Sequence, residues 1–262
     1  MSQSIEIFRE IVHAIEMGRP GVVATVLRHR GSAPGKEFHK MLVFEDGSFV
    51  GTIGGGKMEA TVLEHCREVF ESSEGKVVEV LIAEEEKGGI GGVCGGRAEV
   101  ALELLPSVPR ILLCGGGHCS VELGELIHQL GYLQEVHEDR PELVEADRFP
   151  HALKIHLGSP EDIVETMGDV ARFSHVLLVS RGHATDRVYA RALAAAGYTG
   201  WVGMLASKKK ERYVRKLWLE EDGLDAEFVA RVQAPVGLPI GARSPAEIAV
   251  SIMAQIVESI RG

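Results

Sequence analysis

The chain has 262 residues, of which 45% are hydrophobic, and its formal net charge is −10. This length is long for one hydrophobic core and sufficient for two domains, while the acidic balance argues against a nucleic-acid or membrane-surface partner and favours a small ligand. The sequence shows neither a membrane span nor a signal peptide, so we expect a cytoplasmic protein.

The first part of the chain predicts a small mixed α+β domain. Apolar residues at helical spacing predict a helix over residues 4–17, and a second helix is expected over 59–71. Asp46-Gly47 predicts a hairpin turn. Runs rich in β-branched residues predict strands over residues 22–27, 41–44, 49–53, 77–82 and 98–104.

After Pro106 and Pro109 the pattern changes to alternating strands and helices, which is typical of a parallel sheet. We therefore predict an α/β protein with an N-terminal domain over residues 1–106 and a Rossmann-like domain over 107–262. The strands of the second domain are predicted at 110–114, 133–136, 153–156, 175–179 and 199–203. Its helices are predicted at 119–130, 159–167, 185–196, 208–221 and 246–261.

A glycine turn lies between a predicted strand and a predicted helix in the first domain. Gly54, Gly55 and Gly56 place backbone N–H groups at a helix N-terminus, an arrangement that binds anions. Glu59 follows in the first turn of the helix. It either caps the helix or accepts hydrogen bonds from a ring ligand.

Four cysteines stand at positions 66, 94, 114 and 119, without the spacing of a zinc site or a disulfide framework. We expect free thiols. Cys94 is flanked by Gly95 and Gly96. It is either a small buried side chain or a thiolate stabilised by exposed N–H groups, and the latter would be a nucleophile or a soft-metal ligand.

A second glycine turn opens the predicted parallel sheet. Gly115 and Gly117 lie between a buried strand and a helix, as in dinucleotide-binding folds, and His118 follows them. A small residue, Ser120, comes next at the position where the helix packs closely. A parallel-sheet domain without a bound dinucleotide is the alternative.

Two acidic residues support a nucleotide at this turn. Glu138 and Asp139 lie about 20 residues beyond it, where an acidic side chain accepts from ribose hydroxyls. The adjacent Arg140 either compensates a phosphate or is a surface charge.

Three later segments follow the strands of the second domain. His183 and Asp186 form either an acid–base pair or part of a helix start. Ser207 before Lys208 is either an N-cap or a phosphate clamp. The segment 244–247 reads as a capping box with a structural role.

Together these motifs resemble the XdhC/CoxI family of xanthine dehydrogenase accessory proteins over nearly the whole chain. The resemblance implies a chaperone more than a catalyst. Such a protein binds molybdenum cofactor, as molybdopterin or its dinucleotide form, supports its sulfuration and inserts it into a molybdenum hydroxylase. The motifs that carry the resemblance are segments 31–34, 51–59, 94–96, 115–118, 138–141, 182–186, 207–210 and 234–245.

The resemblance also implies roles for individual residues. The glycine turns and Ser207 would hold the phosphate, Glu59 would bind the pterin, and Cys94 would face molybdenum or the transferred sulfur. Many family members carry cysteine where Lys57 stands, so Lys57 is expected to hold a phosphate instead. Expected partners are a xanthine dehydrogenase-like client, a cysteine desulfurase and a second copy of the chain.

A rival function is an NAD(P)-dependent oxidoreductase. It would use Gly115, Gly117 and Glu138 for the nucleotide, and His183 with Asp186 for proton transfer. This function accounts for the second domain only. A nucleotide-sensing module without chemistry would leave Cys94 and the first glycine turn without a role.

Overall fold

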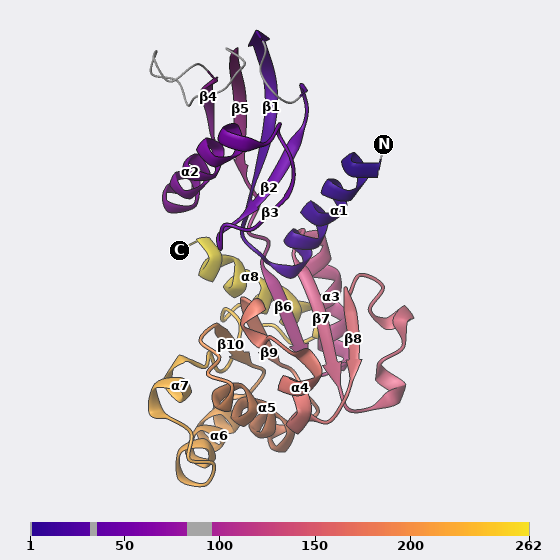
Figure 1. Ribbon diagram of the computed structural model, residues 1–262. Coiled ribbons are helices and arrows are strands. Elements are labelled where there is room, and N and C mark those ends of the chain that lie inside the picture. The colour runs from indigo at the N-terminus through magenta and orange to yellow at the C-terminus, as the bar shows by residue number, and fades with distance from the viewer. Residues whose placement is uncertain (1, 32–35, 83–95, 262) are drawn as a thin grey trace. The chain divides into compact units, whose positions relative to one another are not determined.

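The computed structural model describes residues 2–31, 36–82 and 96–261. It divides into two compact units, one ending at Ser107 and the other beginning at Val108. The first unit contains an antiparallel sheet and the second a parallel one (Figure 1). The predicted fold class, a mixed α+β unit followed by a Rossmann-like parallel sheet, is confirmed. In the described part of the chain, none of the helices is long and apolar enough to cross a membrane.

The first unit is built on a five-stranded sheet in the order β3-β2-β1-β5-β4. Its strands are β1 (Gly21–Gly31), β2 (Lys40–Phe44), β3 (Phe49–Gly51), β4 (Lys76–Ile82) and β5 (Gly96–Leu104). Its helices are α1 (Ser2–Met17) and α2 (Gly56–Ser72). The predicted hairpin turn joins β2 to β3, where the Ser48 N–H donates to Asp46 Oδ1 over 2.9 Å.

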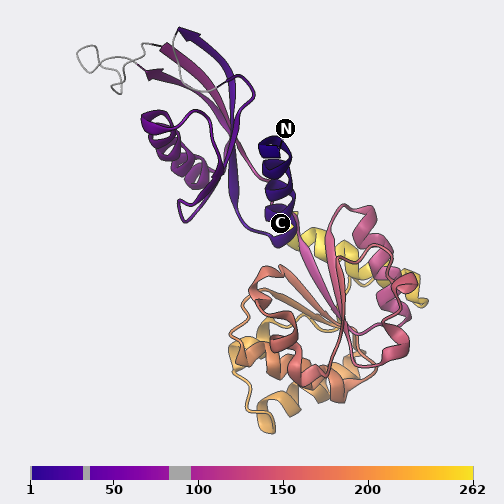
Figure 2. The same ribbon diagram turned by 45° about the vertical axis from the view of Figure 1, so that its right-hand side comes forward.

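Alternating side chains of β1 bury both faces of this sheet. Val22 and Val26 pack with Met58 of α2, while Val23 packs with Ile7 of α1. Figure 2 shows the two helices on opposite faces of the sheet. The period-two pattern therefore produces a strand covered by helices on both sides.

The second unit is a parallel sheet in the order β10-β9-β6-β7-β8. Its strands are β6 (Arg110–Cys114), β7 (Leu133–Glu138), β8 (Lys154–Leu157), β9 (His175–Leu178) and β10 (Trp201–Met204). Its helices are α3 (His118–Gln129), α4 (Ile163–Met167), α5 (His183–Ala195), α6 (Lys208–Glu220), α7 (Ala226–Arg231) and α8 (Pro245–Arg261). Short 3₁₀ turns are η2 (Pro141–Leu143), η3 (Ala146–Arg148), η4 (Pro160–Asp162) and η5 (Val170–Arg172).

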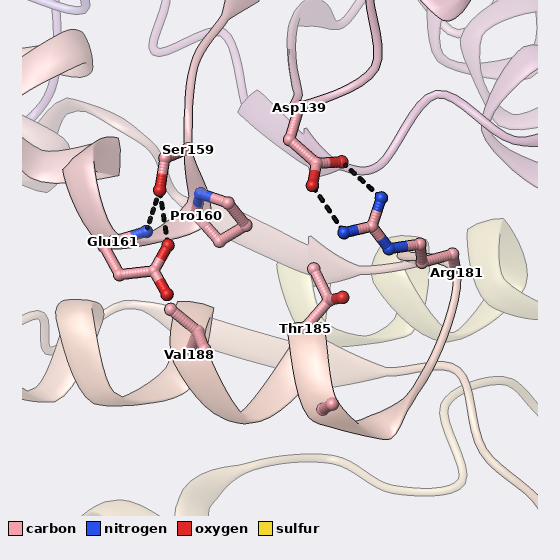
Figure 3. Close-up of a pocket in the computed structure, with 8 residues that line it drawn as sticks. Asp139, Ser159, Pro160, Glu161, Arg181, Thr185 and Val188 are labelled. Carbon is pink, nitrogen blue, oxygen red and sulfur yellow. Dashed lines mark hydrogen bonds and ion pairs between the residues drawn. The ribbon is translucent and has the colours of Figure 1, made fainter.

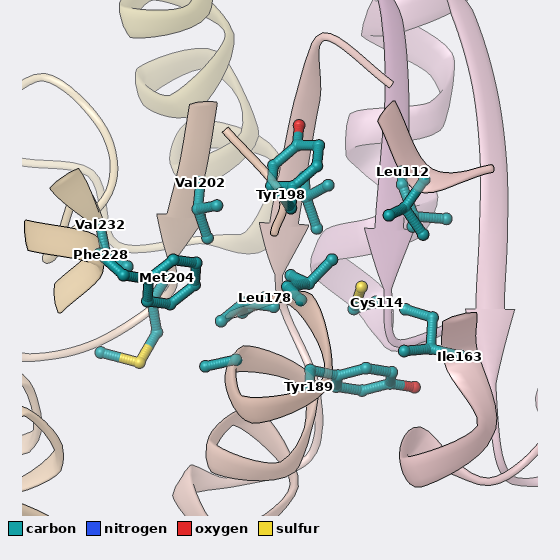
Figure 4. Close-up of a cluster of buried hydrophobic side chains, with 14 of the residues drawn as sticks. Leu112, Cys114, Ile163, Leu178, Tyr189, Tyr198, Val202, Met204, Phe228 and Val232 are labelled. Atoms are coloured by element: carbon teal, nitrogen blue, oxygen red, sulfur yellow. The ribbon is translucent and has the colours of Figure 1, made fainter. Parts of the chain in front are cut away.

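Helices cover both faces of the parallel sheet. On one face, Leu112 and Cys114 of β6 belong to a core that includes Tyr189 of α5 (Figure 4). Trp218 of α6 belongs to the same core. On the other face, Leu113 packs in a core formed with α3 and α8. Strands buried on both faces read as continuous apolar runs, which is why residues 110–114 gave a correct strand prediction.

One edge of the parallel sheet is covered by a later segment of the chain. Gln233 forms a parallel bridge with Gly203 of β10. The Gln233 N–H donates to Val202 O over 2.8 Å, and the Met204 N–H donates to Gln233 O over 2.9 Å. Val236 then donates to Met204 O. The backbone groups of β10 are thus satisfied on its outer side.

Most predicted elements differ from the structure only by a few residues at their ends, and two differences are larger. The helix predicted over 159–167 is a 3₁₀ turn followed by α4, and α4 stops at Gly168, whose φ is +69°. Helix α7 was not predicted, because six residues are too few to show a period. Its one local signal is Asp225, whose side chain accepts from the N–H groups of Glu227 and Phe228.

The predicted capping box at α8 is confirmed. The Ser244 N–H donates to Glu247 Oε2 over 2.9 Å, and the Glu247 N–H donates to Ser244 Oγ over 3.3 Å. These reciprocal bonds satisfy backbone donors that the first turn of a helix leaves open.

A buried ionic cluster lies on the α5 side of the parallel sheet. Glu135 is 1% exposed and accepts hydrogen bonds from Arg110 and Arg172, and its Oε2 lies 2.6 Å from His156 Nε2. Although burial alone would raise the pKa of Glu135, these partners lower it to about 2. The carboxylate therefore stays charged inside the unit.

His137, next to this cluster, makes stability depend on pH. Its ring is fully buried, Nδ1 lies 2.9 Å from the Tyr189 hydroxyl, and burial lowers its pKa from 6.5 to about 4. As pH falls below 6.5, the unfolded chain binds the proton first. We therefore expect His137 to reduce the free energy of unfolding by roughly 3 kcal/mol between pH 6.5 and 4, with no effect above that window.

Urea unfolding at a series of pH values checks this expectation against a His137→Gln variant. The variant should show a shallower loss of stability between pH 6.5 and 4. His175, whose pKa burial also lowers to about 4, is present in both proteins and cancels in the comparison. Parallel pH profiles for the two proteins would contradict the assignment to His137.

Candidate functional site

The carboxyl ends of the parallel strands form the candidate site. The chain enters the sheet at β6, and later strands are added first on one side of it, as β7 and β8, and then on the other, as β9 and β10. The strand order therefore reverses between β6 and β9. Open α/β sheets bind their ligands at this kind of switch point, outside the carboxyl ends of the strands.

Gly115 allows the first loop of this edge to approach β9. Its φ is +126°, and a Cβ there would lie 2.6 Å from Val179 O and 2.8 Å from Ser180 Cα. Its N–H donates to His137 O over 2.8 Å. Only glycine fits this contact between backbones, so Gly115 shapes the site through close packing.

Gly117 lies at the open side of the same turn. It is the N-cap of α3, with φ −71° and no side-chain cap, and a Cβ at this position would meet nothing within 4 Å. His118, the first residue of α3, is exposed. The first N–H groups of a helix carry partial positive charge, so this end of α3 suits an anionic group.

Glu138 is used by the protein itself. It is 2% exposed, and its carboxylate accepts from the Gly116 N–H over 2.6 Å and from two nitrogens of the Arg140 guanidinium over 2.7 and 2.9 Å. Although burial opposes it, these bonds lower the pKa of Glu138 to about 2. A ribose could bind Glu138 only by replacing Arg140, and Arg140 here compensates a carboxylate instead of a phosphate.

Asp139, the next residue, lies at the rim of a pocket. Its carboxylate is paired with Arg181 of the loop after β9, with an Nη2–Oδ2 distance of 2.7 Å (Figure 3). Burial and the neighbouring Glu138 raise the pKa of Asp139. The pocket has a volume of about 380 Å³ and lies between the loops after β7, β8 and β9.

The acid–base pair predicted for His183 and Asp186 is not formed. Asp186 is fully buried, with Oδ1 2.5 Å from the Ser180 hydroxyl and Oδ2 2.6 Å from Lys210 Nζ. His183 is exposed and contacts the ring of Tyr213 edge-on. The helix starts earlier than predicted, with Gly182 as its N-cap, so neither side chain caps it.

Ser207 caps α6 as one of its two interpretations predicted. Its hydroxyl accepts from the Lys210 N–H over 3.2 Å, and Lys208 is exposed in the first helical turn. Sequence reasoning did not find the contact of Lys210 with Asp186. Lys210 also donates to Leu205 O over 2.9 Å, so it ties α6 to the end of β10 and to α5.

The first glycine turn is held by Glu59. Its Oε1 accepts from the Thr52 hydroxyl over 2.5 Å, from the Ile53 N–H over 3.2 Å and from the Gly55 N–H over 3.0 Å. Gly54, Gly55 and Gly56 all have positive φ, which favours glycine. Glu59 therefore organises the turn that precedes α2, as the capping interpretation expected, and Lys57 lies in the first turn of α2.

Only part of the cysteine motif of the first domain, residues 94–96, lies within the described residues. Cys94 and Gly95 lie outside the described residues, and Gly96 is the first residue of β5. The described cysteines are free thiols, and burial raises the pKa of Cys66 to about 11 and that of Cys114 well above its ordinary value. Within the described ranges, no group of three or more His, Cys, Asp or Glu side chains could hold a metal ion.

Comparisons with known proteins agree with this architecture. The family described as XdhC Rossmann domain matches residues 111–256, and the XdhC and CoxI family matches residues 14–81. The uncharacterized protein YqeB of Escherichia coli K12 is 31% identical over 259 residues, covering 97% of this chain and 46% of YqeB. A Bacillus subtilis protein named as a probable subunit of xanthine dehydrogenase is 27% identical over 153 residues, covering 58% of this chain and 43% of that protein.

A solved structure shows the same fold. It is a Bacillus halodurans protein described as a xanthine dehydrogenase, with a TM-score of 0.53, 21% identity and coverage of 96% of each chain. This chain spans less than half the length of the two curated relatives. Since the Rossmann-domain match extends over more than half of its residues, the chain belongs to the XdhC and CoxI family.

Proposed function

We propose that this protein is an accessory factor of a xanthine dehydrogenase-type molybdenum hydroxylase. In this role it binds molybdenum cofactor, supports its sulfuration with a cysteine desulfurase as partner, and inserts it into the client enzyme. Membership of the XdhC and CoxI family is the observation that carries the proposal. The Bacillus subtilis relative, by its name a probable part of a xanthine dehydrogenase, supports the choice of client.

The described residues fit the phosphate end of this cofactor at one place. The N-terminus of α3 has open space at Gly117 and no side-chain cap. The first glycine turn fits less well than expected, because the N–H groups of Gly54 and Gly55 are already bonded to Thr52 and Glu59. The N-terminus of α3 is therefore the proposed phosphate site, in preference to that of α2.

The metal end of the cofactor requires little from the described residues. A molybdenum bound by the dithiolene of its own pterin needs at most a further thiol from the protein. When bound, the cofactor supplies a molybdenum centre whose oxo ligand is exchanged for sulfur. Cys94 is the proposed contact for that centre. Glu59 is assigned to holding the glycine turn at residues 54–56 and not to binding the pterin.

The oxidoreductase alternative loses support at its reaction site. The parallel sheet and its switch point suit a nucleotide, but the proton-transfer pair is missing, since Asp186 is bonded to Ser180 and Lys210. The buried Asp186 carboxylate holds Lys210 of α6 in place, and the exposed His183 is not among its hydrogen-bond partners. The accessory function is therefore preferred.

Anaerobic co-purification from cells supplied with molybdate tests the proposal. Metal is measured by mass spectrometry and pterin by fluorescence after oxidation. Molybdenum and pterin retained together, and reduced in a Cys94→Ala variant, would support the carrier function. A nicotinamide nucleotide retained without molybdenum would overturn it in favour of the oxidoreductase.

A charge at position 117 should block the phosphate. Because Gly117 has the extended conformation of an N-cap and free space for a side chain, Gly117→Asp should fold normally and place a carboxylate in the anion position. We expect it to retain at least about tenfold less molybdenum and pterin than the wild type. Gly117→Asn is the matched control, an equally good N-cap without the charge, and should retain most of the cofactor. If the two variants retained equal amounts of molybdenum and pterin, the N-terminus of α3 would not be the phosphate site.

A further inference from the structure

The first unit has a pocket of its own, on the face of the antiparallel sheet that α1 covers. Its volume is about 290 Å³, close to the lower end of the range for small-molecule sites, about 300–1,000 Å³. Its lining comes from three parts of the unit: α1 (Ile7, Phe8), the start of β2 and the residues before it (Phe38, Lys40), and the end of β3 (Gly51, Thr52). The proposed function assigns no role to this pocket.

Phe38 holds a backbone conformation that favours glycine. Its φ is +68°, in the left-handed region. The Phe38 N–H donates to Val26 O over 2.7 Å, and the Val26 N–H donates to His39 O over 3.0 Å. Two residues thus face one residue of β1, which is the pattern of a β-bulge whose left-handed position is normally glycine. The chain has a phenylalanine at that position instead.

The Phe38 side chain contributes little to the packing of the unit. It is 71% exposed, and Phe8, which lines the same pocket, is 54% exposed. The contact of α1 with the sheet is made by Ile7, which is 5% exposed and packs in the core. An aromatic ring that is both strained in its backbone and open to solvent is typical of a binding site. The pocket therefore presents two aromatic rings whose faces the fold does not use.

Gly51 allows α1 to lie close to the end of β3. Its φ is +84°, and a Cβ at this position would lie 2.6 Å from Ile7 Cδ1 and 2.6 Å from Lys40 O. All three residues line the pocket. Any larger residue would push α1 away from the sheet, so glycine here preserves the shape of the pocket.

Lys40 gives the pocket a positive charge. Leu42 packs with Ile7 under α1, and Lys40, two residues earlier on β2, shares that face of the sheet. Its Nζ donates to the Thr25 hydroxyl over 2.9 Å. Among the described residues, Lys40 forms no ion pair with a carboxylate, and none of those that line the pocket is Asp or Glu.

The other polar side chain of the lining, Thr52, is already occupied. Its N–H donates to Lys40 O over 3.0 Å, and its hydroxyl donates to Glu59 Oε1 over 2.5 Å. An ammonium group has three N–H donors, and the bond to Thr25 uses one of them. The Lys40 ammonium is therefore the group that can bind a polar part of a ligand, and its charge favours an anion.

We infer that this pocket binds a small planar aromatic anion, such as an aromatic carboxylate. The ring lies against Phe8 and Phe38, and the carboxylate accepts a hydrogen bond from Lys40. Aromatic walls favour flat rings over saturated ones, and the single positive charge favours an anion over a neutral or cationic ligand. The inference goes beyond the proposed function, because it concerns a different ligand and needs no molybdenum.

Ligand-observed saturation-transfer NMR on the full chain, purified from cells grown without molybdate, tests the inference. The probes are 2-naphthoate, its neutral analogue 2-naphthamide, and cyclohexanecarboxylate, an anion without a flat ring. We expect 2-naphthoate to bind with a Kd of about 1 mM or below, and the other two at least about tenfold more weakly. Absence of 2-naphthoate binding, or equal binding of all three probes, would overturn the inference.

Phe38→Gly separates binding from folding. The backbone already has the conformation that glycine adopts without strain, so the melting temperature of this variant should stay the same or rise. Its affinity for 2-naphthoate should fall at least about tenfold, because one aromatic wall is gone. A loss of binding in a protein that is at least as stable as the wild type cannot come from misfolding.

Lys40→Met tests the charge. It should weaken 2-naphthoate about tenfold, to the affinity of 2-naphthamide, while 2-naphthamide itself binds as before. Phe49→Ala is the control, since Phe49 is another exposed phenylalanine of the same sheet and lies outside the pocket lining. It should bind 2-naphthoate as the wild type does. Unchanged 2-naphthoate binding by Phe38→Gly and Lys40→Met would place the probe elsewhere and overturn the inference.

Discussion

Replacement of Gly115 by alanine is expected to lower the free energy of unfolding of the parallel-sheet unit by about 3 kcal/mol or more. The added Cβ would lie 2.6 Å from Val179 O and 2.8 Å from Ser180 Cα, and both atoms belong to the backbone where β9 ends. Neither can move without displacing a central strand. A φ of +126° adds conformational strain for any residue with a side chain.

Tryptophan fluorescence during urea unfolding measures this loss. The chain has two tryptophans, Trp201 and Trp218, and both lie in the second unit, so the signal reports on that unit alone. Gly117→Ala is the control in the same turn. Its Cβ meets nothing and its φ is −71°, so it should change stability by less than about 1 kcal/mol. Similar losses for the two variants would contradict the close-packing role of Gly115.

The second large effect is expected at the buried ionic cluster. Glu135→Leu removes the carboxylate that accepts hydrogen bonds from Arg110 and Arg172 and lies 2.6 Å from His156. The buried positive charge is then no longer neutralised by Glu135. We expect the free energy of unfolding to fall by about 3–5 kcal/mol, the cost of removing one partner from a buried ion pair.

A double variant separates charge from packing. Removing both charges with Arg110→Met and Glu135→Leu should cost less than Glu135→Leu alone, because apolar residues of similar size replace buried ion pairs with little penalty. The low pKa of Glu135 also sets the pH range in which its ion pairs stabilise the fold. Glu135, with a pKa of about 2, stabilises the fold above pH 4.5 and loses that contribution as pH falls towards 2. A double variant less stable than the single one would argue that shape, not charge, holds the cluster.

Elements with strong local patterns were predictable from sequence. The structure contains the predicted strands at 110–114 and 41–44 and the predicted capping box at Ser244. Each of these features is determined by residues that are close together in the sequence. The helix predicted over 159–167 ends where expected, at Met167, but its first part is a separate 3₁₀ turn capped by Ser159. Local propensity does not distinguish such a turn from the first turn of an α-helix.

The sequence indicated where the residues of the candidate site lie in the fold, but it did not indicate their hydrogen-bond partners. Strand order brings Gly115, Glu138 and Asp139 to one edge, as spacing indicated. Which acid is buried, however, depends on Arg140 folding back, and the partner of Asp186 comes from Lys210, in another helix, 24 residues further along the chain. Such contacts depend on how separate elements pack together, and the hydrophobic periodicity of the sequence does not reveal this packing.

The segment that covers β10 has a consequence for association. An uncovered strand offers unpaired N–H and C=O groups on which a foreign strand can assemble. Gln233 and Val236 occupy those groups along β10, and the Arg215 guanidinium donates to Val232 O over 2.7 Å, which anchors the start of the segment. At the opposite side of the sheet, β8 is only four residues long and begins with the exposed Lys154. Both margins of the parallel sheet are therefore poor templates for strand addition, so association through this unit would have to use helices or loops.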